Sequence, residues 1–193
     1  MHNRVVIFLS AAVFAFAVPA RADLSARVVD VGPGLCVVLP HDDHVVLYDA
    51  GHWQGNRCKA ALDAVMGAGN ASASKQLDLV VFSHSDGDHV GDEEEILEAY
   101  KPARVLHTGF RVGSVSAAYT KTLAAIQSSG ASDLNRQSST ILPGATFQFG
   151  EMFVTFVAGW GKPPTEWGLT QPAHKNNAVS VVIRVTYAGR SIL

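Results

Sequence analysis

The sequence has little of several features that mark particular protein classes. It contains two cysteines, three methionines and three tryptophans in 193 residues, and charged residues make up 17% of it. Its 15 basic side chains are matched by 17 acidic ones, which excludes binding of a polyanion by general attraction. No internal repeat or low-complexity segment is present, which excludes collagen-like and coiled-coil proteins. The hydrophobic share of 48% instead predicts a folded chain of about one domain.

The N-terminus has the pattern of an export signal. Arg4 provides a positive start, Val5–Val18 is an apolar run of 14 residues, and residues 20–22 have the A-x-A form of a cleavage site. A membrane-spanning helix needs about 18 apolar residues, so cleavage is favoured over anchoring. We therefore expect a signal peptide over residues 1–22 and a mature domain over residues 23–193, exported to the periplasm or secreted, with no stable membrane anchor.

The two cysteines have two open interpretations. An oxidising compartment permits a disulfide between Cys36 and Cys58, which would close a loop of about 22 residues and stabilise the fold by about 3 kcal/mol. The alternative is two unpaired buried thiols. Metal binding is not favoured, because neither cysteine lies in a C-x-x-C pair or beside a histidine.

Hydrophobic periodicity predicts strands that alternate with helices, followed by paired strands. Residues 77–82 form a nearly unbroken apolar run, typical of a strand buried on both faces. The other expected strands cover residues 25–39, 44–50, 104–107, 146–157 and 179–187, and the expected helices cover residues 56–66 and 114–129 and the segment from Asp92 to Pro102. This pattern predicts an α/β protein with a layered sheet covered by helices.

Three other groups of polar residues are interpreted as structural. His41 and His44 lie at the tip of a predicted hairpin, where solvated turn residues are favoured over a metal pair. The acidic run 92–95 falls in the first turn of a predicted helix, where carboxylates complement the helix dipole. His107 is expected to pack at the end of its strand.

Four side chains of metal-binding types follow the buried strand. His84, Asp86, Asp88 and His89 fall within six positions at its carboxyl end, where open α/β sheets gather their sites. A calcium loop would need further oxygen ligands, and Val90 follows instead. A serine triad would need a G-x-S-x-G elbow, which is absent. A plain polar loop is the remaining alternative, but imidazoles and carboxylates at this spacing favour a divalent metal site.

The same segment resembles the H-x-H-x-D-H signature of the metallo-β-lactamase superfamily, with Asp86 in place of the second histidine. Three shorter motifs follow in the family's order: the D-V-G-x-G segment at residues 30–34, the D-A-G segment at residues 49–51, and the asparagine pair at residues 176–177. Together they resemble the hydrolase domain of ComEC-type DNA-uptake proteins from about residue 26 onward. The resemblance implies the αββα sandwich of the superfamily.

The resemblance also implies a site for two divalent metal ions. His84 and Asp86 would help to hold one ion, and Asp88 and His89 the other. Asp88 would be the catalytic residue that orients a metal-activated water and accepts its proton. Zinc is expected, with manganese or magnesium as alternatives, because a carboxylate at Asp86 makes the site harder. Asp49 would support the site from behind rather than bind metal.

Further residues are expected around this site by the same resemblance. The region of Asn176 and Asn177 falls where the superfamily supplies another ligand, and His174, just before the pair, is a second candidate for that role. His52 and Trp53 follow the D-A-G turn and are expected to line the cleft.

In the family, a strand like that at residues 179–187 leads into a Thr-Gly-Asp turn and a later histidine, both metal-binding. Neither occurs before Leu193. We therefore expect a domain whose C-terminal part is missing, either as a fragment of a longer protein or as an incomplete homologue. The fragment is favoured, because the last strand would otherwise leave an open sheet edge.

The leading functional hypothesis is an exported hydrolase that uses metal-activated water on a phosphodiester or another small phosphorylated substrate. Nucleic acid would then be held by the metal ions or a local patch, not by bulk charge. One alternative is a catalytically inactive domain used for binding or assembly. A β-lactamase is the third.

Overall fold

The computed structural model describes residues 23–51, 55–67, 76–113, 117–138 and 140–193. The predicted signal peptide and the two expected cleft residues, His52 and Trp53, lie outside these ranges. Across the described ranges, no helix combines the length and apolar character needed to cross a membrane.

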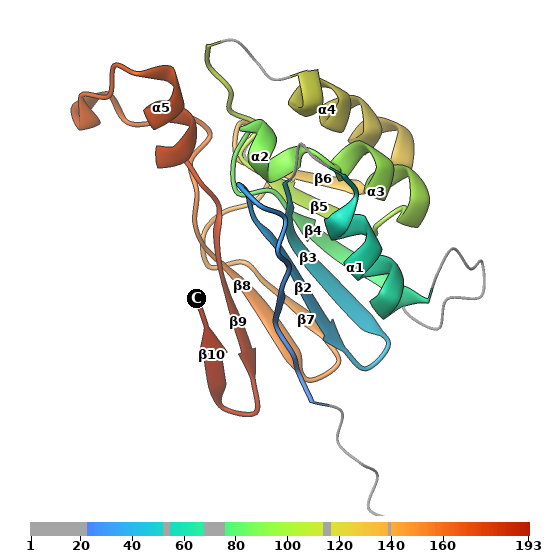
Figure 1. Ribbon diagram of the computed structural model, residues 1–193. Coiled ribbons are helices and arrows are strands. Elements are labelled where there is room, and N and C mark those ends of the chain that lie inside the picture. The colour runs from blue at the N-terminus through green and yellow to red at the C-terminus, as the bar shows by residue number, and fades with distance from the viewer. Residues whose placement is uncertain (1–22, 52–54, 68–75, 114–116, 139) are drawn as a thin grey trace, which may run out of the picture.

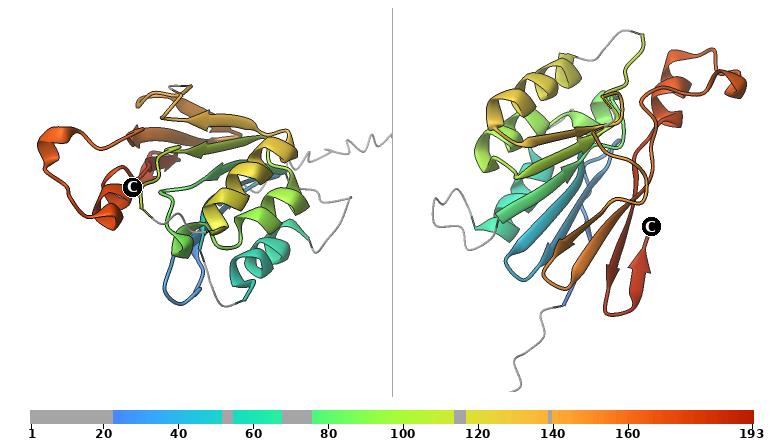
Figure 2. Two further views of the ribbon diagram at one scale, coloured as in Figure 1. Left: turned by 90° about the horizontal axis from the view of Figure 1, so that it is seen from above. Right: turned by 180° about the vertical axis from the view of Figure 1, so that it is seen from behind.

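The described residues form two β-sheets that lie face to face, with three helices on the outer face of the first sheet (Figures 1 and 2). The first sheet has the strand order β1 Arg27–Val28, β2 Cys36–His41, β3 His44–Ala50, β4 Gln76–Val81, β5 Arg104–His107 and β6 Ser132–Asn135. Strands β3 to β6 run parallel, and β1 to β3 are antiparallel. This is the α/β fold that the sequence predicts.

The second sheet is antiparallel throughout. Its order is β10 Arg190–Ile192, β9 Val182–Tyr187, β8 Met152–Ala158 and β7 Thr146–Phe149. The helices are α1 Arg57–Met66, α2 Gly87–Val90, α3 Glu93–Tyr100, α4 Ala117–Ser129 and α5 Pro172–Ala178, with a 3₁₀ turn at Thr165–Trp167. Helices α1, α3 and α4 cover the first sheet, whereas α2 and α5 lie at one end of the molecule (Figures 1 and 2).

Strand β4 separates two hydrophobic cores. Leu77, Val80 and Phe82 face the helices, and Leu79 and Val81 face the second sheet, with at most 1% of any of these side chains exposed. Burying a side chain of this size stabilises the fold by roughly 1.5–3 kcal/mol. The predicted burial of this strand on both faces is thus confirmed.

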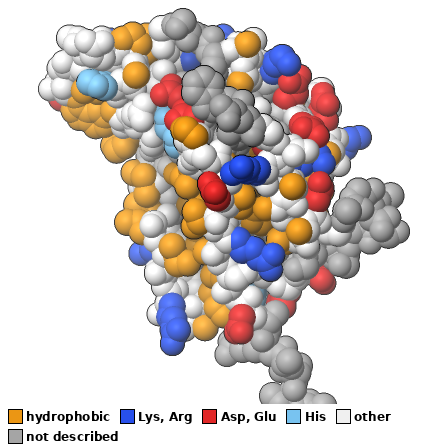
Figure 3. All heavy atoms as spheres, viewed as in Figure 1, with side chains coloured by type: hydrophobic (Ala, Val, Ile, Leu, Met, Phe, Trp, Pro, Cys, Tyr) orange, Lys and Arg blue, Asp and Glu red, His pale blue; other side chains and the backbone are white. Residues whose placement is uncertain are grey.

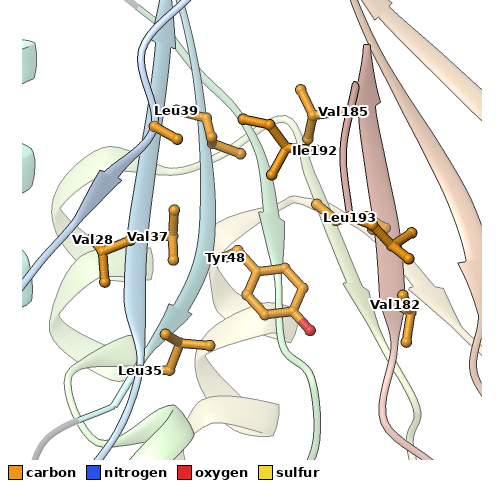
Figure 4. Close-up of a pocket in the computed structure, with 11 residues that line it drawn as sticks. Val28, Leu35, Val37, Leu39, Tyr48, Val182, Val185, Ile192 and Leu193 are labelled. Atoms are coloured by element: carbon orange, nitrogen blue, oxygen red, sulfur yellow. The ribbon is translucent and has the colours of Figure 1, made fainter. Parts of the chain in front are cut away.

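The core between the sheets opens at one edge into a cavity of about 390 Å³ (Figure 4). Leu39 on β2 and Val185 on β9 lie on its opposite sides, and Ile192 and Leu193 lie near its opening with 50% and 81% of their surface exposed. Hydrophobic side chains are correspondingly visible on this face of the molecule (Figure 3). The first core is therefore closed by helices, whereas the second reaches solvent.

Most predicted elements are present, with bounds shifted by a few residues. Two expected strands are each divided. The segment 25–39 contains β1 and the first part of β2, which pair antiparallel. The segment 146–157 forms β7 and β8, which reverse at Gly150 with φ 59°. Sequence analysis missed four short helices and strands, α2, β6, α5 and β10, and the 3₁₀ turn. Their sequences, such as Ser132–Asn135, are too short and polar to show a hydrophobic period.

Of the two interpretations of the cysteines, the structure has the disulfide. Cys36 of β2 and Cys58 of α1 are bonded, with their Cα atoms 5.9 Å apart and both side chains fully buried. The bond connects the first sheet to the first helix that covers it.

The interpretation of His41 as a solvated turn residue is wrong. It is the last residue of β2 and only 2% exposed, and its ring lies 4.7 Å from the Tyr187 ring, centroid to centroid. The physical reason is that the end of β9 in the second sheet covers this end of β2. His44, on the other side of the turn, is partly exposed and bonds the Asp78 carboxylate at 3.0 Å.

The first turn of α3 also departs from the prediction. Glu94 forms an exposed ion pair with Lys121 at 3.0 Å, as a solvated carboxylate can. Glu93, in contrast, is fully buried, and neither carboxyl oxygen has a hydrogen-bond partner in the described part of the chain. Burial, followed by the charges of Asp49 and Asp92, raises the pKa of Glu93 well above its ordinary value. Complementing the helix dipole therefore does not account for Glu93.

Candidate metal centre

Two parallel strands bring the polar residues of the motif to one edge of the first sheet. Tyr48 of β3 pairs with Val81 of β4, so the residues that follow each strand lie side by side. Asp49 follows Tyr48, and Ser83 begins the loop that leads into α2. This edge faces α5, which approaches from the second sheet (Figure 1).

Asp49 is a fully buried carboxylate with three hydrogen-bond donors around it. One oxygen accepts the backbone N–H of Ser83 at 2.6 Å, and the other accepts the Ser83 hydroxyl at 2.7 Å and Nδ1 of His89 at 2.8 Å. These bonds offset the cost of removing the charge from water. The backbone of Asp49 is left-handed, with φ 54°, which is uncommon for a residue other than glycine.

The hydrogen bonds assign the tautomers of both histidines in the motif. The Ser83 hydroxyl gives its single proton to Asp49, so it accepts a proton from Nδ1 of His84 at 2.8 Å. Nδ1 of His89 donates to the Asp49 carboxylate. In their neutral forms, both rings therefore keep a lone pair on Nε2. A metal-binding histidine has this arrangement when its other ring nitrogen donates a hydrogen bond, here to the Asp49 carboxylate for His89 and to the Ser83 hydroxyl for His84.

The environment shifts the pKa of the two rings in opposite directions. Burial, followed by the neighbouring His89, lowers the pKa of His84, so its ring is neutral at neutral pH. Burial alone would also lower the pKa of His89, but its hydrogen bond to Asp49 and the nearby carboxylates outweigh burial and raise it. The ring centroids are 4.1 Å apart, so these two sites are close neighbours.

The two histidine–aspartate pairs have spacings suited to a shared cation. Nε2 of His84 lies 3.6 Å from Oδ2 of Asp86, and Nε2 of His89 lies 3.8 Å from Oδ2 of Asp88. Two ligands about 2.1 Å from a zinc ion at a tetrahedral angle lie roughly 3.4 Å apart. In the described ranges, no three His, Cys, Asp or Glu side chains are arranged to hold one ion. Each pair thus fits two ligands of a coordination sphere, not a whole one.

The asparagine pair of α5 contacts Asp86. The side-chain amide of Asn176 donates to one carboxylate oxygen of Asp86 and that of Asn177 donates to the other, both at 3.0 Å. This contact spans 90 residues of sequence and connects the second sheet to the metal motif. His174 is exposed on the same helix and, among the described residues, has no hydrogen bond or ion pair with the motif.

Two glycines allow the backbone of α2 to lie against the ends of β2 and β3. A Cβ atom at Gly51 would lie 1.5 Å from the carbonyl oxygen of Asp88, and one at Gly34 would lie 2.4 Å from the same atom. The backbone N–H of Leu35 donates to that oxygen at 3.3 Å. The glycines of the D-V-G-x-G and D-A-G segments therefore set the position of Asp88 through backbone contact.

Sequence reasoning missed two serines of this site. Ser83 joins Asp49 to His84, and Ser180 lies 3.4 Å from Nδ1 of His84. The position of Ser83 directly after a buried strand was a usable signal, but nothing local marked Ser180. His107 lies apart from the motif; it is buried and bonds Asp133 at 2.8 Å, in keeping with packing at a strand end.

Comparisons with known proteins agree with this fold. The Rm3 metallo-β-lactamase has a TM-score of 0.50 and 17% identity, with 84% of this chain and 55% of that chain covered. The MIM-2 metallo-β-lactamase gives 0.50 and 13%, covering 82% and 53%. A metallo-β-lactamase with a HARLDQ motif from Cronobacter sakazakii gives 0.49 and 14%, covering 81% and 50%. The chain spans about half the length of these solved structures. At such identities, the likeness to the Rm3 and MIM-2 enzymes shows the fold alone.

No curated protein sequence matches the chain. The family model of the metallo-β-lactamase superfamily, however, matches residues 29–193, from the residue after β1 through the asparagine pair and β10. Because this match covers most of the sequence, the chain belongs to the metallo-β-lactamase superfamily.

Proposed function

We propose that this chain is an exported metal-dependent hydrolase that cleaves phosphodiesters and is most similar to the hydrolase domain of ComEC-type proteins. The observation that supports it best is the pair of imidazoles whose Nδ1 atoms are bonded from behind while Nε2 of each lies within 3.8 Å of a motif carboxylate. Two neutral imidazoles whose Nε2 lone pairs lie near carboxylate oxygens make no hydrogen bond there, so a purely structural role does not explain this arrangement, whereas a bound cation would.

His84 and Asp86 would hold one divalent ion and Asp88 and His89 the other, and the ions would supply a water made acidic enough to attack at neutral pH. Asp49 orients the His89 ring by a direct hydrogen bond and the His84 ring through Ser83. Asp88 has 45% of its side chain exposed, so it can contact a substrate and accept the proton of the attacking water.

A phosphodiester is favoured over a β-lactam by the donor set. Asp86 supplies a hard, anionic oxygen where the family signature has an imidazole, which weakens the Lewis acidity of a bound ion and favours manganese or magnesium beside zinc. Cleavage of a phosphodiester depends on charge neutralisation at two oxygens, which a pair of ions supplies. The amides of Asn176 and Asn177 orient this carboxylate by donating to both of its oxygens.

Export is supported by the disulfide. A buried Cys36–Cys58 bond is expected in a protein that folds in an oxidising compartment such as the periplasm. The N-terminal export pattern of the sequence agrees with this location.

The proposal is tested with the purified mature chain, residues 23–193, loaded with Zn²⁺, Mn²⁺ or Mg²⁺. We expect retained metal by mass spectrometry and hydrolysis of bis(p-nitrophenyl) phosphate. Asp88→Asn should reduce kcat at least about 100-fold with an unchanged circular dichroism spectrum. Asp43→Asn, at the exposed tip of the β2–β3 turn, is the matched control and should keep full activity.

Other results would replace the proposal. A folded chain that retains no metal and cleaves no phosphodiester would indicate a binding or assembly domain. If the gene encodes residues beyond Leu193, the longer protein must give the same result. Rapid hydrolysis of a chromogenic cephalosporin, without phosphodiester cleavage, would indicate a β-lactamase.

A further inference from the structure

A second cavity lies beside the candidate metal centre, between the loop that follows β5 and the segment that leads into α5. Its volume is about 370 Å³, within the range of small-molecule sites. The wall is largely apolar and includes Phe110, Val112, Pro163 and Leu169, and two lysines, Lys162 and Lys175, also line it.

The two lysines bring positive charge to an otherwise largely apolar wall. In the described part of the molecule, neither ammonium group has a hydrogen-bond or ion-pair partner, and no carboxylate lines the cavity. Lys59 and Lys121, by contrast, are paired with Asp63 and Glu94. Two unpaired cations beside an apolar wall, in a chain with a net negative charge, would bind a ligand that combines an anion with an apolar group.

Asn176 connects this cavity to the candidate metal centre. On one side its amide donates to Asp86, and on the other its carbonyl oxygen accepts the backbone N–H of Val112 at 3.1 Å. Lys175, which lines the cavity, directly precedes Asn176 in α5. The cavity and Asp86 therefore lie one side chain apart, which is close enough for one extended substrate to contact both.

We infer that this cavity binds the nucleoside part of a nucleotide substrate, with the base against the Phe110 wall and a phosphate between Lys162 and Lys175. The inference rests on the proposed phosphodiesterase function and adds the substrate class. Flat rings contact aromatic and apolar side chains favourably whatever the base, so the cavity predicts preference for nucleotides without a sequence preference. It also provides the local positive patch that the overall charge of the chain lacks.

The test measures binding of thymidine 5′-monophosphate to metal-free protein by NMR titration, with thymidine and inorganic phosphate as comparison ligands. We expect thymidine 5′-monophosphate to bind more tightly than either. The double variant K162A/K175A should weaken its binding at least about tenfold, because each lysine loses a charge-assisted contact, while thymidine binding changes little. Phe110→Ala should weaken the binding of both thymidine and its phosphate.

Lys121→Ala is the control for net charge, since Lys121 lies on α4 and is paired with Glu94. It should leave the binding of thymidine 5′-monophosphate unchanged. The inference is overturned if this nucleotide does not bind, if it binds K162A/K175A as tightly as the unmodified chain, or if inorganic phosphate binds equally well and Phe110→Ala has no effect.

The two proposals can fail separately, because this binding assay needs neither metal nor turnover. Nucleotide binding without cleavage of bis(p-nitrophenyl) phosphate would refute the proposed reaction and keep the binding site. Cleavage without nucleotide binding would keep the reaction and refute this site.

Discussion

Histidines and aspartates lie at both ends of strand β3, but the histidines differ in their hydrogen bonds. At its carboxyl end, Asp49 binds His89 and Ser83, and each of these bonds is 2.8 Å or shorter. At its amino end, His44 bonds the Asp78 carboxylate at 3.0 Å. His41, across the β2–β3 turn, is instead buried with no hydrogen bond to either ring nitrogen among the described residues, although the Asp42 carboxylate lies 3.5 Å away. Figure 1 places the two ends at opposite sides of the molecule.

The difference follows from the strands rather than from the histidines. Parallel β3 and β4 end side by side, so the residues that follow them can bond to one another and converge. The antiparallel β2–β3 turn brings His41 against the second sheet, where Tyr187 offers a ring face. A histidine beside an aspartate in sequence therefore predicts a bonded cluster only where the chain topology supplies the partners.

The largest expected effect tests whether the carboxyl end depends on backbone contact. Gly51→Ala would place a Cβ atom 1.5 Å from the carbonyl oxygen of Asp88, so the loop must move. We expect a loss of at least about 3 kcal/mol in unfolding free energy, or roughly 6–12 °C in Tm, measured by thermal denaturation.

Gly130→Ala is the control, because it adds left-handed strain at φ 77° but has no atom within 4 Å of the new Cβ. Its expected cost is about 1 kcal/mol. Equal losses in the two variants would show that the Asp88 contact is not what requires glycine at position 51.

The second prediction concerns Glu93, the exception at the well-bonded end. Its folded-state pKa is raised, so the folded chain holds a proton that the unfolded chain releases above about pH 4.3. The stability that this proton contributes is complete below that pH and is lost, by about 1.4 kcal/mol per pH unit, as pH rises toward the folded pKa. Glu93→Gln should remove this loss and be more stable by about 1–3 kcal/mol at pH 7, but not at pH 4.

Urea denaturation at several pH values measures this difference. Glu95→Gln, at an exposed position of the same helical turn, should show no comparable pH-dependent gain. A constant difference between Glu93→Gln and the unmodified chain across pH would contradict burial of a protonated carboxyl.

The last comparison replaces His41 and His89 with phenylalanine, and the smallest effect is expected at His41. His41→Phe keeps the ring against Tyr187 and removes two nitrogens without hydrogen bonds, so stability should be unchanged or rise by up to about 1 kcal/mol. His89→Phe removes a donor to buried Asp49 and should cost about 1–3 kcal/mol. Chemical denaturation of both metal-free variants measures these changes in unfolding free energy. If both variants lost stability, or both gained it, the proposed contrast between the two ends of β3 would be wrong.

Much of this architecture follows from local sequence. The apolar run of β4 and the residue types after it predict both the strand and the position of the candidate site. The resemblance to the family supplies the support role expected of Asp49, and the structure places Asp49 against His89. The strand prediction succeeds because it depends on the hydrophobic pattern of neighbouring residues.

The remaining features depend on contacts between distant segments. Nothing near Asp86 indicates that amides 90 residues later donate to it, and α5 is too short for a periodic pattern. The burial of His41 depends in the same way on Tyr187, and that of Glu93 on its packing near Asp49. Such tertiary contacts override local propensity.

The backbone contact at Gly34 and Gly51 makes the position of the loop at Asp88 independent of which side chains the loop carries. Main-chain contacts hold the backbone of Asp88 in place, so neighbouring side chains can be substituted without moving that backbone. Asp86→His would then change which metal ion a site here favours without changing the backbone. It would also remove the acceptor of the two α5 amides. A fold of this design can diversify its inorganic chemistry one substitution at a time.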